Sequence, residues 1–198
     1  MVKIKINNNE EDIPIGIIEE FGQVQFEIFP KIKNAVGSFK SQNRKNILDL
    51  GCGLGWNSIF LAKEGFDIYA GDICKEYIDT LRDKANKMNL RNINCKELDM
   101  KDIPYEDNSF DVVICTSALV HGTLKEIKMI INEIYRVLKP DGILIADLLS
   151  VEDESFGMGE KIELFKLFKE VCVYRRNYIF DRVHEEVISK VYDIECIK

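Results

Sequence analysis

The sequence contains no apolar run close to the ~18 residues that a membrane-spanning helix requires. Its first residues, MVKIKINNNEED, lack the apolar stretch and the small-residue cleavage site of a signal peptide. No low-complexity stretch is present, and 198 residues are enough to bury one hydrophobic core. We therefore expect a single globular domain that resides in the cytoplasm and does not associate with membranes.

The sequence also lacks cysteine pairs at metal-binding or redox spacing, and its basic residues do not outnumber its acidic ones. The six cysteines form no CxxC pair and no zinc-ligand spacing, so we expect reduced thiols and no metal site. The 27 Lys and Arg residues are outnumbered by 34 Asp and Glu, which gives a net charge of −7. Because proteins that bind phosphate backbones present a basic face, this balance argues against nucleic acid as the partner. No pattern specifies an oligomeric state.

From residue 45 onward, short apolar runs alternate with amphipathic stretches. Strands are expected at 47–50, 67–71, 93–95, 110–115 and 142–149, and helices between them at 57–64, 75–88 and 123–138. A short helix near 160–168 and a final pair of strands at about 170–180 and 186–197 are expected after them. Thr123 and Glu126 form a capping box that predicts the start of the third of these helices. Because parallel strands need crossover helices, the pattern predicts an α/β fold with a doubly wound, mostly parallel seven-stranded sheet and a C-terminal antiparallel hairpin.

The first 44 residues show a different pattern. Apolar side chains recur with helical spacing from Ile13 to Val36, interrupted by Pro30, so we expect a kinked helix or two short helices. The single domain (1–198) is accordingly divided into an N-terminal helical cap segment (1–44), a cofactor-binding core (45–149) and a C-terminal helix and hairpin (150–198). Phenylalanines 21, 26 and 29 of the first segment fit either a packed helix face or the wall of an acceptor pocket.

Glycines follow the first expected strand at alternating positions, in Asp49-x-Gly51-x-Gly53-x-Gly55. A dinucleotide-binding loop instead reads GxGxxG, and its third glycine lets the helix approach the strand closely. Trp56 occupies that third position here, and no Gly-Lys-Ser/Thr of a P-loop follows. The loop therefore predicts a ligand that needs close backbone approach but carries no phosphate. The indole either packs over that ligand or belongs to the core.

Acidic residues supply the other contacts that such a ligand would need. Asp72 ends the second expected strand, where its carboxylate either accepts both hydroxyls of a ribose or caps the next helix. Asp99-Met100 follows the third strand, where a carboxylate and a backbone N–H suit an adenine edge. Asp49 suits a cationic amino-acid end. A nucleoside, an amino acid and no phosphate together describe S-adenosylmethionine.

The stretch from Lys45 to Leu149 resembles the class I S-adenosylmethionine-dependent methyltransferases, and more narrowly their small-molecule branch. DLGCGLG, AGDI, ELDMKDIPYEDNSFDVVI and EIYRVLKPDGIL occur in the family's order. The resemblance implies a Rossmann-like methyltransferase fold, S-adenosylmethionine as cofactor, and methyl transfer to a small-molecule acceptor by in-line displacement. It also implies cofactor contacts for Asp49, Gly51, Cys52 and Gly53 at the methionine end, Asp72 and Ile73 at the ribose, Asp99 and Met100 at the adenine, and Cys115 near the methyl donor.

The loop after the fourth strand, CTSALVHG, bears on the reaction. His121 is the candidate general base, and its alternative role is to cap or pack at the start of the following helix. The Asn/Asp-Pro-Pro-aromatic motif of enzymes that methylate planar amino nitrogens is absent, which favours a small-molecule acceptor. Aminopropyl transfer from the decarboxylated cofactor is disfavoured, because this loop has no acidic residue for a polyamine. The alternative to an enzyme is a non-catalytic module that binds the cofactor or serves as a partner subunit.

Overall fold

The computed structural model describes residues 3–14, 18–20, 23–25, 30–119, 123–150, 164–182 and 185–198. The strands are β1 (Lys3–Pro14), β2 (Ile18–Glu20), β3 (Gln23–Gln25), β4 (Asn46–Leu50), β5 (Asp67–Asp72), β6 (Ile93–Glu97), β7 (Phe110–Cys115), β8 (Leu138–Ser150), β9 (Glu170–Arg182) and β10 (Glu185–Ile197). The helices are α1 (Pro30–Ser41), α2 (Trp56–Lys63), α3 (Lys75–Lys87) and α4 (Leu124–Val137).

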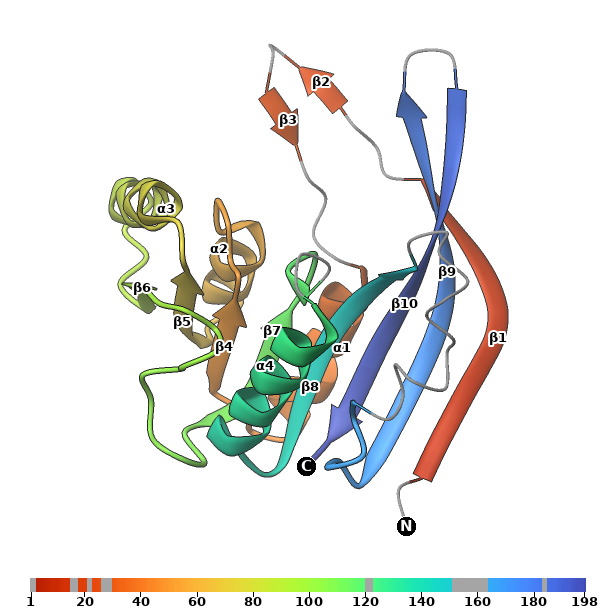
Figure 1. Ribbon diagram of the computed structural model, residues 1–198. Coiled ribbons are helices and arrows are strands. Elements are labelled where there is room, and N and C mark those ends of the chain that lie inside the picture. The colour runs from red at the N-terminus through yellow and green to blue at the C-terminus, as the bar shows by residue number, and fades with distance from the viewer. Residues whose placement is uncertain are drawn as a thin grey trace.

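Eight strands form one sheet in the order β1-β9-β10-β8-β7-β4-β5-β6 (Figure 1). Strands β4 to β8 pair in parallel, whereas β10 runs antiparallel to both of its neighbours, β8 and β9. The expected doubly wound, mostly parallel seven-stranded sheet with an antiparallel C-terminal hairpin is confirmed, and β1 adds an eighth strand. The order reverses at β4, because its chain neighbour β5 lies on one side and β7 on the other. Ligands of such sheets bind at that reversal, outside the carboxyl ends of the strands.

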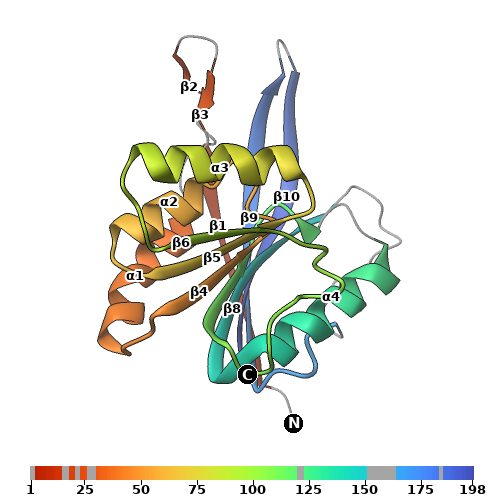
Figure 2. The ribbon, with the colours of Figure 1, turned by 90° about the vertical axis from the view of Figure 1, so that its left-hand side faces the viewer.

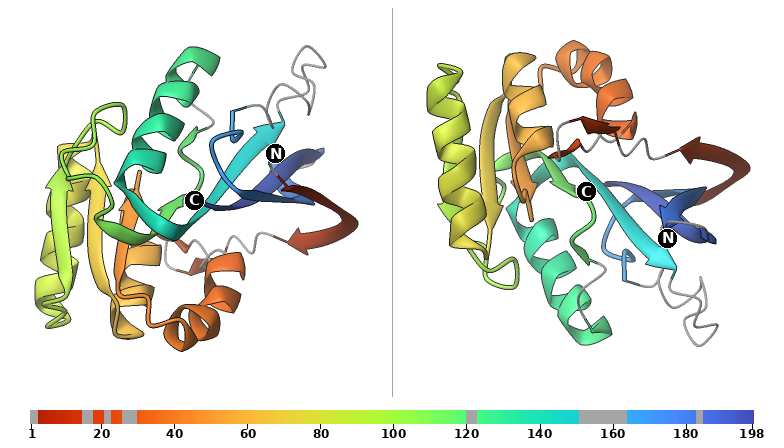
Figure 3. Two further views of the ribbon diagram at one scale, coloured as in Figure 1. Left: turned by 90° about the horizontal axis from the view of Figure 1, so that it is seen from below. Right: turned by 90° about the horizontal axis from the view of Figure 1, so that it is seen from above.

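The sheet separates two hydrophobic cores, because successive residues of a strand face opposite sides. Ile47 of β4 packs in the core formed with α1, α2 and α3, and Leu48 faces the core formed with α4. Figure 3 shows the same layers, with α4 on the face opposite α1 and α2. Both faces of the central strands are therefore covered, and only the ends of the strands are free to form a site.

The expected helix over 13–36 is wrong in its first half. Residues 3–14 form β1, which pairs in parallel with β9 from Lys3↔Glu170 onward, and β2 and β3 form a separate antiparallel pair. The helix begins only at Pro30, which starts α1 instead of kinking it. Proline suits this position because the first N–H groups of a helix have no intrahelical acceptor. Segment 1–44 is thus not a helical cap, and phenylalanines 21, 26 and 29 lie outside the described residues.

The short helix expected near 160–168 is also wrong within the described residues, since 164–169 form turns and bends. Phe165 and Phe168 of these turns are buried in the core beside α4. The two hairpins β2–β3 and β9–β10 extend beyond the carboxyl ends of the parallel strands (Figures 1 and 2). No helix in the described part of the chain is long and apolar enough to cross a bilayer.

Candidate functional site

The glycine loop between β4 and α2 folds back onto β5. Gly51, Gly53 and Gly55 have positive φ angles of 72°, 52° and 80°, a conformation that side chains disfavour. The N–H groups of Gly51 and Cys52 donate to the Gly71 carbonyl at 2.8 and 3.0 Å. A Cβ on Gly53 would meet no atom within 4 Å, so the backbone of the loop is open to a ligand at that position.

Gly55 has a different role from the other two glycines. A Cβ at this position would lie 2.2 Å from Leu81 Cδ1, so only glycine lets the start of α2 approach α3. Trp56 follows as the first residue of α2, and Lys84 Nζ lies 4.8 Å from the centre of its ring. The indole Nε1 is buried and has no hydrogen-bond partner among the described residues. Trp56 is partly buried and belongs to neither hydrophobic core, so these contacts do not distinguish its two expected roles.

Asp72 joins the glycine loop to the start of α3. Its Oδ2 accepts from the Gly53 N–H and its Oδ1 from the Cys74 N–H, both at 2.9 Å. A carboxylate has about four lone-pair sites, so each oxygen can still accept from a ribose hydroxyl. The two roles considered for Asp72, helix cap and ligand contact, are therefore compatible. Ile73 beside it is 67% exposed, an unusual position for a large apolar side chain.

Asp49 lies beneath the loop and is only 2% exposed. Ser58 Oγ of α2 donates to its Oδ2 at 2.5 Å. Burial raises the pKa of Asp49 to about 6 against the opposing effect of the Ser58 hydrogen bonds, and the nearby charge of Asp72 raises it further. A buried carboxylate with this pKa is stabilised in its ionised form by a cation. Ser58 carried no signal in the sequence, because its contact with Asp49 depends on how α2 packs.

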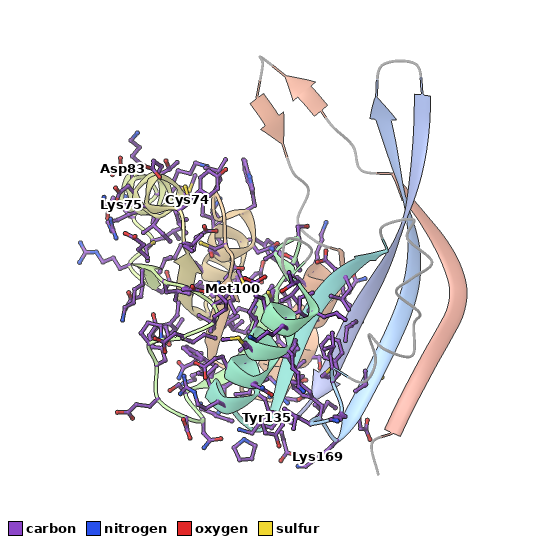
Figure 4. All side chains as sticks on the ribbon, viewed as in Figure 1. Cys74, Lys75, Asp83, Met100, Tyr135 and Lys169 are labelled. Carbon is purple, nitrogen blue, oxygen red and sulfur yellow. The ribbon has the colours of Figure 1, made fainter. Side chains whose placement is uncertain are left out.

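Asp99 and Met100 follow β6 in a turn. Asp99 Oδ1 accepts from the Lys101 N–H at 2.9 Å, and Lys101 Nζ lies 3.7 Å from Asp99 Oδ2. The Met100 side chain reaches the glycine loop, since its Cε would lie 3.3 Å from a Cβ on Gly51. Figure 4 labels Met100, which follows β6, and Cys74, which follows β5. The turn after β6 therefore contacts the glycine loop directly.

Cys115 ends β7 and is fully buried. Burial raises the pKa of its thiol, and the charges of Asp147 and Asp49 raise it further, so the thiol stays protonated. Burial likewise raises the pKa of the Cys52 thiol. His121 lies outside the described residues, so its predicted role has no geometry attached to it.

A cavity of about 700 Å³ lies away from this site. Its lining residues come from α3, from the loop between α3 and β6, and from the first residues of β5 and β6, among them Asp67, Arg82 and Asn92. The glycine loop and Asp72 do not line it, because they lie at the opposite, carboxyl ends of the strands. The cavity is therefore no part of the candidate site.

The fold and the site together define a class of protein. A doubly wound sheet with a three-glycine loop after one strand and a carboxylate ending the next is the arrangement of Rossmann-like proteins that bind a nucleoside cofactor. Residues 47–142 match a family model described as a methyltransferase domain.

Three similar proteins agree with this match. A ubiquinone biosynthesis O-methyltransferase of Rickettsia typhi is 29% identical over 158 residues, which cover 78% of this chain and 61% of that protein. A demethylmenaquinone methyltransferase of Lactobacillus johnsonii is 34% identical over 120 residues, which cover 59% of this chain and 46% of that protein. The crystal structure of a SAM-dependent methyltransferase from Methanosarcina mazei shares the fold with a TM-score of 0.66 at 22% identity, covering 87% of this chain and 99% of the other.

The family model and the similar proteins support the class I S-adenosylmethionine-dependent methyltransferase family for this chain, with S-adenosylmethionine as the cofactor. The chain spans 61% and 46% of the lengths of the two curated relatives.

Proposed function

We propose that this protein transfers a methyl group from S-adenosylmethionine to a small-molecule acceptor. The observation that carries the proposal is an open glycine loop beside two carboxylates, one hydrogen-bonded to the loop backbone and the other buried beneath it. Asp72 holds the Gly53 N–H and keeps free lone pairs, whereas Asp49 is buried beneath the same loop. Such a site suits a neutral ribose above one carboxylate and a cation near the other, and it needs no phosphate.

The residues of the site fit that cofactor in the following roles. Asp72 and Ile73 hold the ribose, and Asp99 with the Met100 N–H reads the adenine edge. Asp49, Gly51, Cys52 and Gly53 surround the methionine end, and the Cys115 backbone lies near the methyl donor. The open space at Gly53 and the exposed side chain of Ile73 support these assignments, because each leaves room or apolar surface for a ligand.

When held by these residues, the cofactor would supply an electrophilic methyl group to an acceptor nucleophile, and its sulfur would leave as a neutral thioether. The protein therefore has to align the acceptor and exclude water, and alignment alone is worth about 7–11 kcal/mol. A positioned base adds a factor of about 10²–10⁴ in rate. Because alignment is the larger contribution, a catalytic dyad is not required, and we identify none among the described residues.

The names of the two relatives narrow the choice of acceptor. One is named as an O-methyltransferase of ubiquinone biosynthesis and the other as a demethylmenaquinone methyltransferase. We infer an aromatic hydroxyl or quinol-type acceptor as the first class to test. The net charge of −7 supports a small molecule over nucleic acid. We further infer a cytoplasmic location, with residues 1–198 folded as one domain.

The first test compares cofactors. Calorimetry should show that S-adenosylhomocysteine binds and that NAD binds far more weakly, because Trp56 replaces the third glycine of a dinucleotide loop. Radiolabelled S-adenosylmethionine with pools of phenols, quinols, amines and thiols, read by product mass, then identifies the acceptor. Tighter binding of NAD would overturn the proposal. Binding of S-adenosylhomocysteine without turnover on any pool would instead favour a non-catalytic module.

A substitution at Asp72 tests the assignment of the ribose site. Asp72→Asn removes one of two oxygen acceptors, so affinity for S-adenosylhomocysteine should fall about tenfold or more, from a charge-assisted hydrogen bond worth about 1.5–3 kcal/mol. Asp79→Asn is the matched control, since Asp79 lies on exposed α3 and pairs with Arg82 at 2.6 Å. Calorimetry on both variants decides. Equal affinities for Asp72→Asn and the parent would rule out this ribose site.

His121 is the base we propose for an acceptor that must lose a proton. With a hydroxyl or ammonium acceptor, His121→Ala should lower turnover by about 10²–10⁴ and leave affinity for S-adenosylhomocysteine unchanged. The parent should then show a rate that rises with pH near about 6.5, as an imidazole loses its proton. With a thiolate acceptor the effect should be far smaller. Joint loss of cofactor affinity and stability would mark His121 as structural.

A further inference from the structure

Asp147 is a buried carboxylate that no sequence motif marks. It lies on β8 and is 3% exposed. Cys115, the last residue of β7, pairs with Ala146 of β8, so Asp147 lies one residue beyond that pair, at the carboxyl edge of the sheet. A charged group is rarely buried unless polar partners hold it, so its position calls for a role.

One partner of Asp147 is the loop that follows β7. The Ser117 N–H donates to Asp147 Oδ1 at 2.6 Å, and Ser117 Oγ lies 3.5 Å from Oδ2. Ser117 has a φ angle of 55°, in the left-handed region that costs a non-glycine residue free energy. A short hydrogen bond to a carboxylate is one of the stronger kinds, and it can hold this backbone conformation in place.

The same loop contacts both the glycine loop and the first turn of α2. A Cβ on Gly51 would lie 2.6 Å from the Cβ of Ala118, the residue after Ser117. Thr116 Oγ1 accepts from Asn57 Nδ2 of α2 at 3.2 Å. A change in the Ser117 backbone would therefore displace residues that lie against the cofactor loop.

We propose that Asp147 is a positioning residue that holds the loop after β7 in its left-handed conformation and so sets the approach of Ala118 to the glycine loop. The carboxylate acts through Ser117 and does not touch the cofactor. The loop after β7 is then already ordered before the cofactor binds, so no part of the binding free energy is used to order it. This role rests on the proposed function, since the cofactor is what the glycine loop would bind.

The test uses the full chain with S-adenosylhomocysteine as the probe. Asp147→Ala should speed hydrogen exchange at the amides of residues 116–119 about tenfold or more and weaken binding of the probe about tenfold. Asp147→Asn keeps an uncharged acceptor and should give a smaller effect of the same sign. Asp141→Asn is the control, because Asp141 lies on the same strand at its exposed, amino-terminal end.

A double variant separates positioning from general destabilisation. Glycine occupies the left-handed region without cost, so Ser117→Gly added to Asp147→Ala should recover most of the lost affinity. A merely structural role of Asp147 would show no such rescue. The inference is overturned if Asp147→Ala leaves both exchange and affinity within about twofold of the parent, or lowers only the melting temperature. Should Asp147→Ala not fold, unchanged exchange in Asp147→Asn overturns it equally. If the parent does not bind S-adenosylhomocysteine, the proposed function is refuted. Hydrogen exchange at residues 116–119 then tests the positioning role of Asp147 by itself.

Discussion

Three aspartates of the site have the same side chain but different surroundings. Asp49 is buried under the glycine loop, Asp72 is held by two backbone N–H groups, and Asp99 is 42% exposed beside Lys101. Burial disfavours the charged form of Asp49 and raises its pKa. A cationic ligand end would therefore interact most strongly at Asp49, where water cannot screen it.

The raised pKa of Asp49 predicts a pH-dependent stability. The folded pKa of about 6 exceeds the ordinary value of 3.8, so the folded state binds this proton more tightly than the unfolded state does. The stabilisation is complete below about pH 4, declines as pH rises to about 6, and amounts to about 3 kcal/mol lost above that window. Asp49→Asn should escape this loss and be more stable than the ligand-free parent at pH 7, with its advantage absent at pH 4.

Urea unfolding of parent and variant at these two pH values measures the difference. The same variant should bind S-adenosylmethionine more weakly at neutral pH, because the anion at the methionine end is gone. If the parent and Asp49→Asn lose equal stability between pH 4 and 7, a group other than Asp49 causes the pH dependence of the unfolding free energy.

Among the elements, α4 is the one whose start is specified locally. The Glu126 N–H donates to Thr123 Oγ1 at 3.4 Å, and the Thr123 N–H donates to Glu126 Oε2 at 3.0 Å, which completes a capping box. The helix then buries Ile131 and Ile134 against the sheet. Thr123, the N-cap of α4, comes two residues after His121 in the sequence, so the capping box sets the start of the helix that follows His121.

Loss of the cap should weaken the protein by a small, measurable amount. Thr123→Ala should lower the free energy of unfolding by about 1 kcal/mol, because an N–H group at the helix start loses its acceptor. Thr123→Ser keeps the hydroxyl and should restore most of the difference. Urea unfolding at neutral pH provides the comparison, and equal midpoints for Thr123→Ala and the parent would show that the box contributes nothing.

In the part of the chain that the structure describes, the site and the hydrogen bonds around Asp111 lie at opposite ends of the sheet. At the amino-terminal end Asp111 Oδ2 accepts from the N–H groups of Lys45 and Asn46, and Oδ1 accepts from Lys139 Nζ, all at 2.9 Å. Burial opposes the ionised form of Asp111, but these hydrogen bonds outweigh it and lower its pKa. The same end carries the Lys169–Asp141 pair, and Lys169 is labelled in Figure 4.

This separation predicts that stability and cofactor binding respond to different substitutions. Asp111→Asn should lower the free energy of unfolding by about 1–3 kcal/mol at neutral pH and leave affinity for S-adenosylhomocysteine within about twofold. The lowered pKa means that the parent keeps this contribution above about pH 4 and loses it as pH falls through the folded pKa.

The control for this prediction is Asp107→Asn. Asp107 is 68% exposed and pairs with Arg136 at 2.9 Å, so its loss should cost less than about 1 kcal/mol. Thermal unfolding and calorimetry on the two variants test the prediction. An Asp111→Asn variant that binds S-adenosylhomocysteine much more weakly would mean that the two ends of the sheet are coupled.

How much could be predicted from the sequence depended on the range of the contacts. The order of the central strands and helices followed from periodicity and capping, which act over a few residues. Strand β1 was missed because its pairing partner β9 lies at the other end of the chain, and its NNNEED stretch has little strand propensity. Ser58 and Ser117 were missed for the same reason, since each contacts a carboxylate that only packing brings near.

The sequence by itself determined the glycine loop, the acidic residues that end β5 and follow β6, and the start of α4. Each depends on a local property: freedom at positive φ, a position at the end of a strand, or a side chain that caps its own helix. Only the tertiary structure decided that Asp49 is buried against Ser58, that Gly55 makes room for Leu81, and that Asp147 holds Ser117. Those facts depend on how helices and strands far apart in the chain pack, and no local pattern encodes that packing.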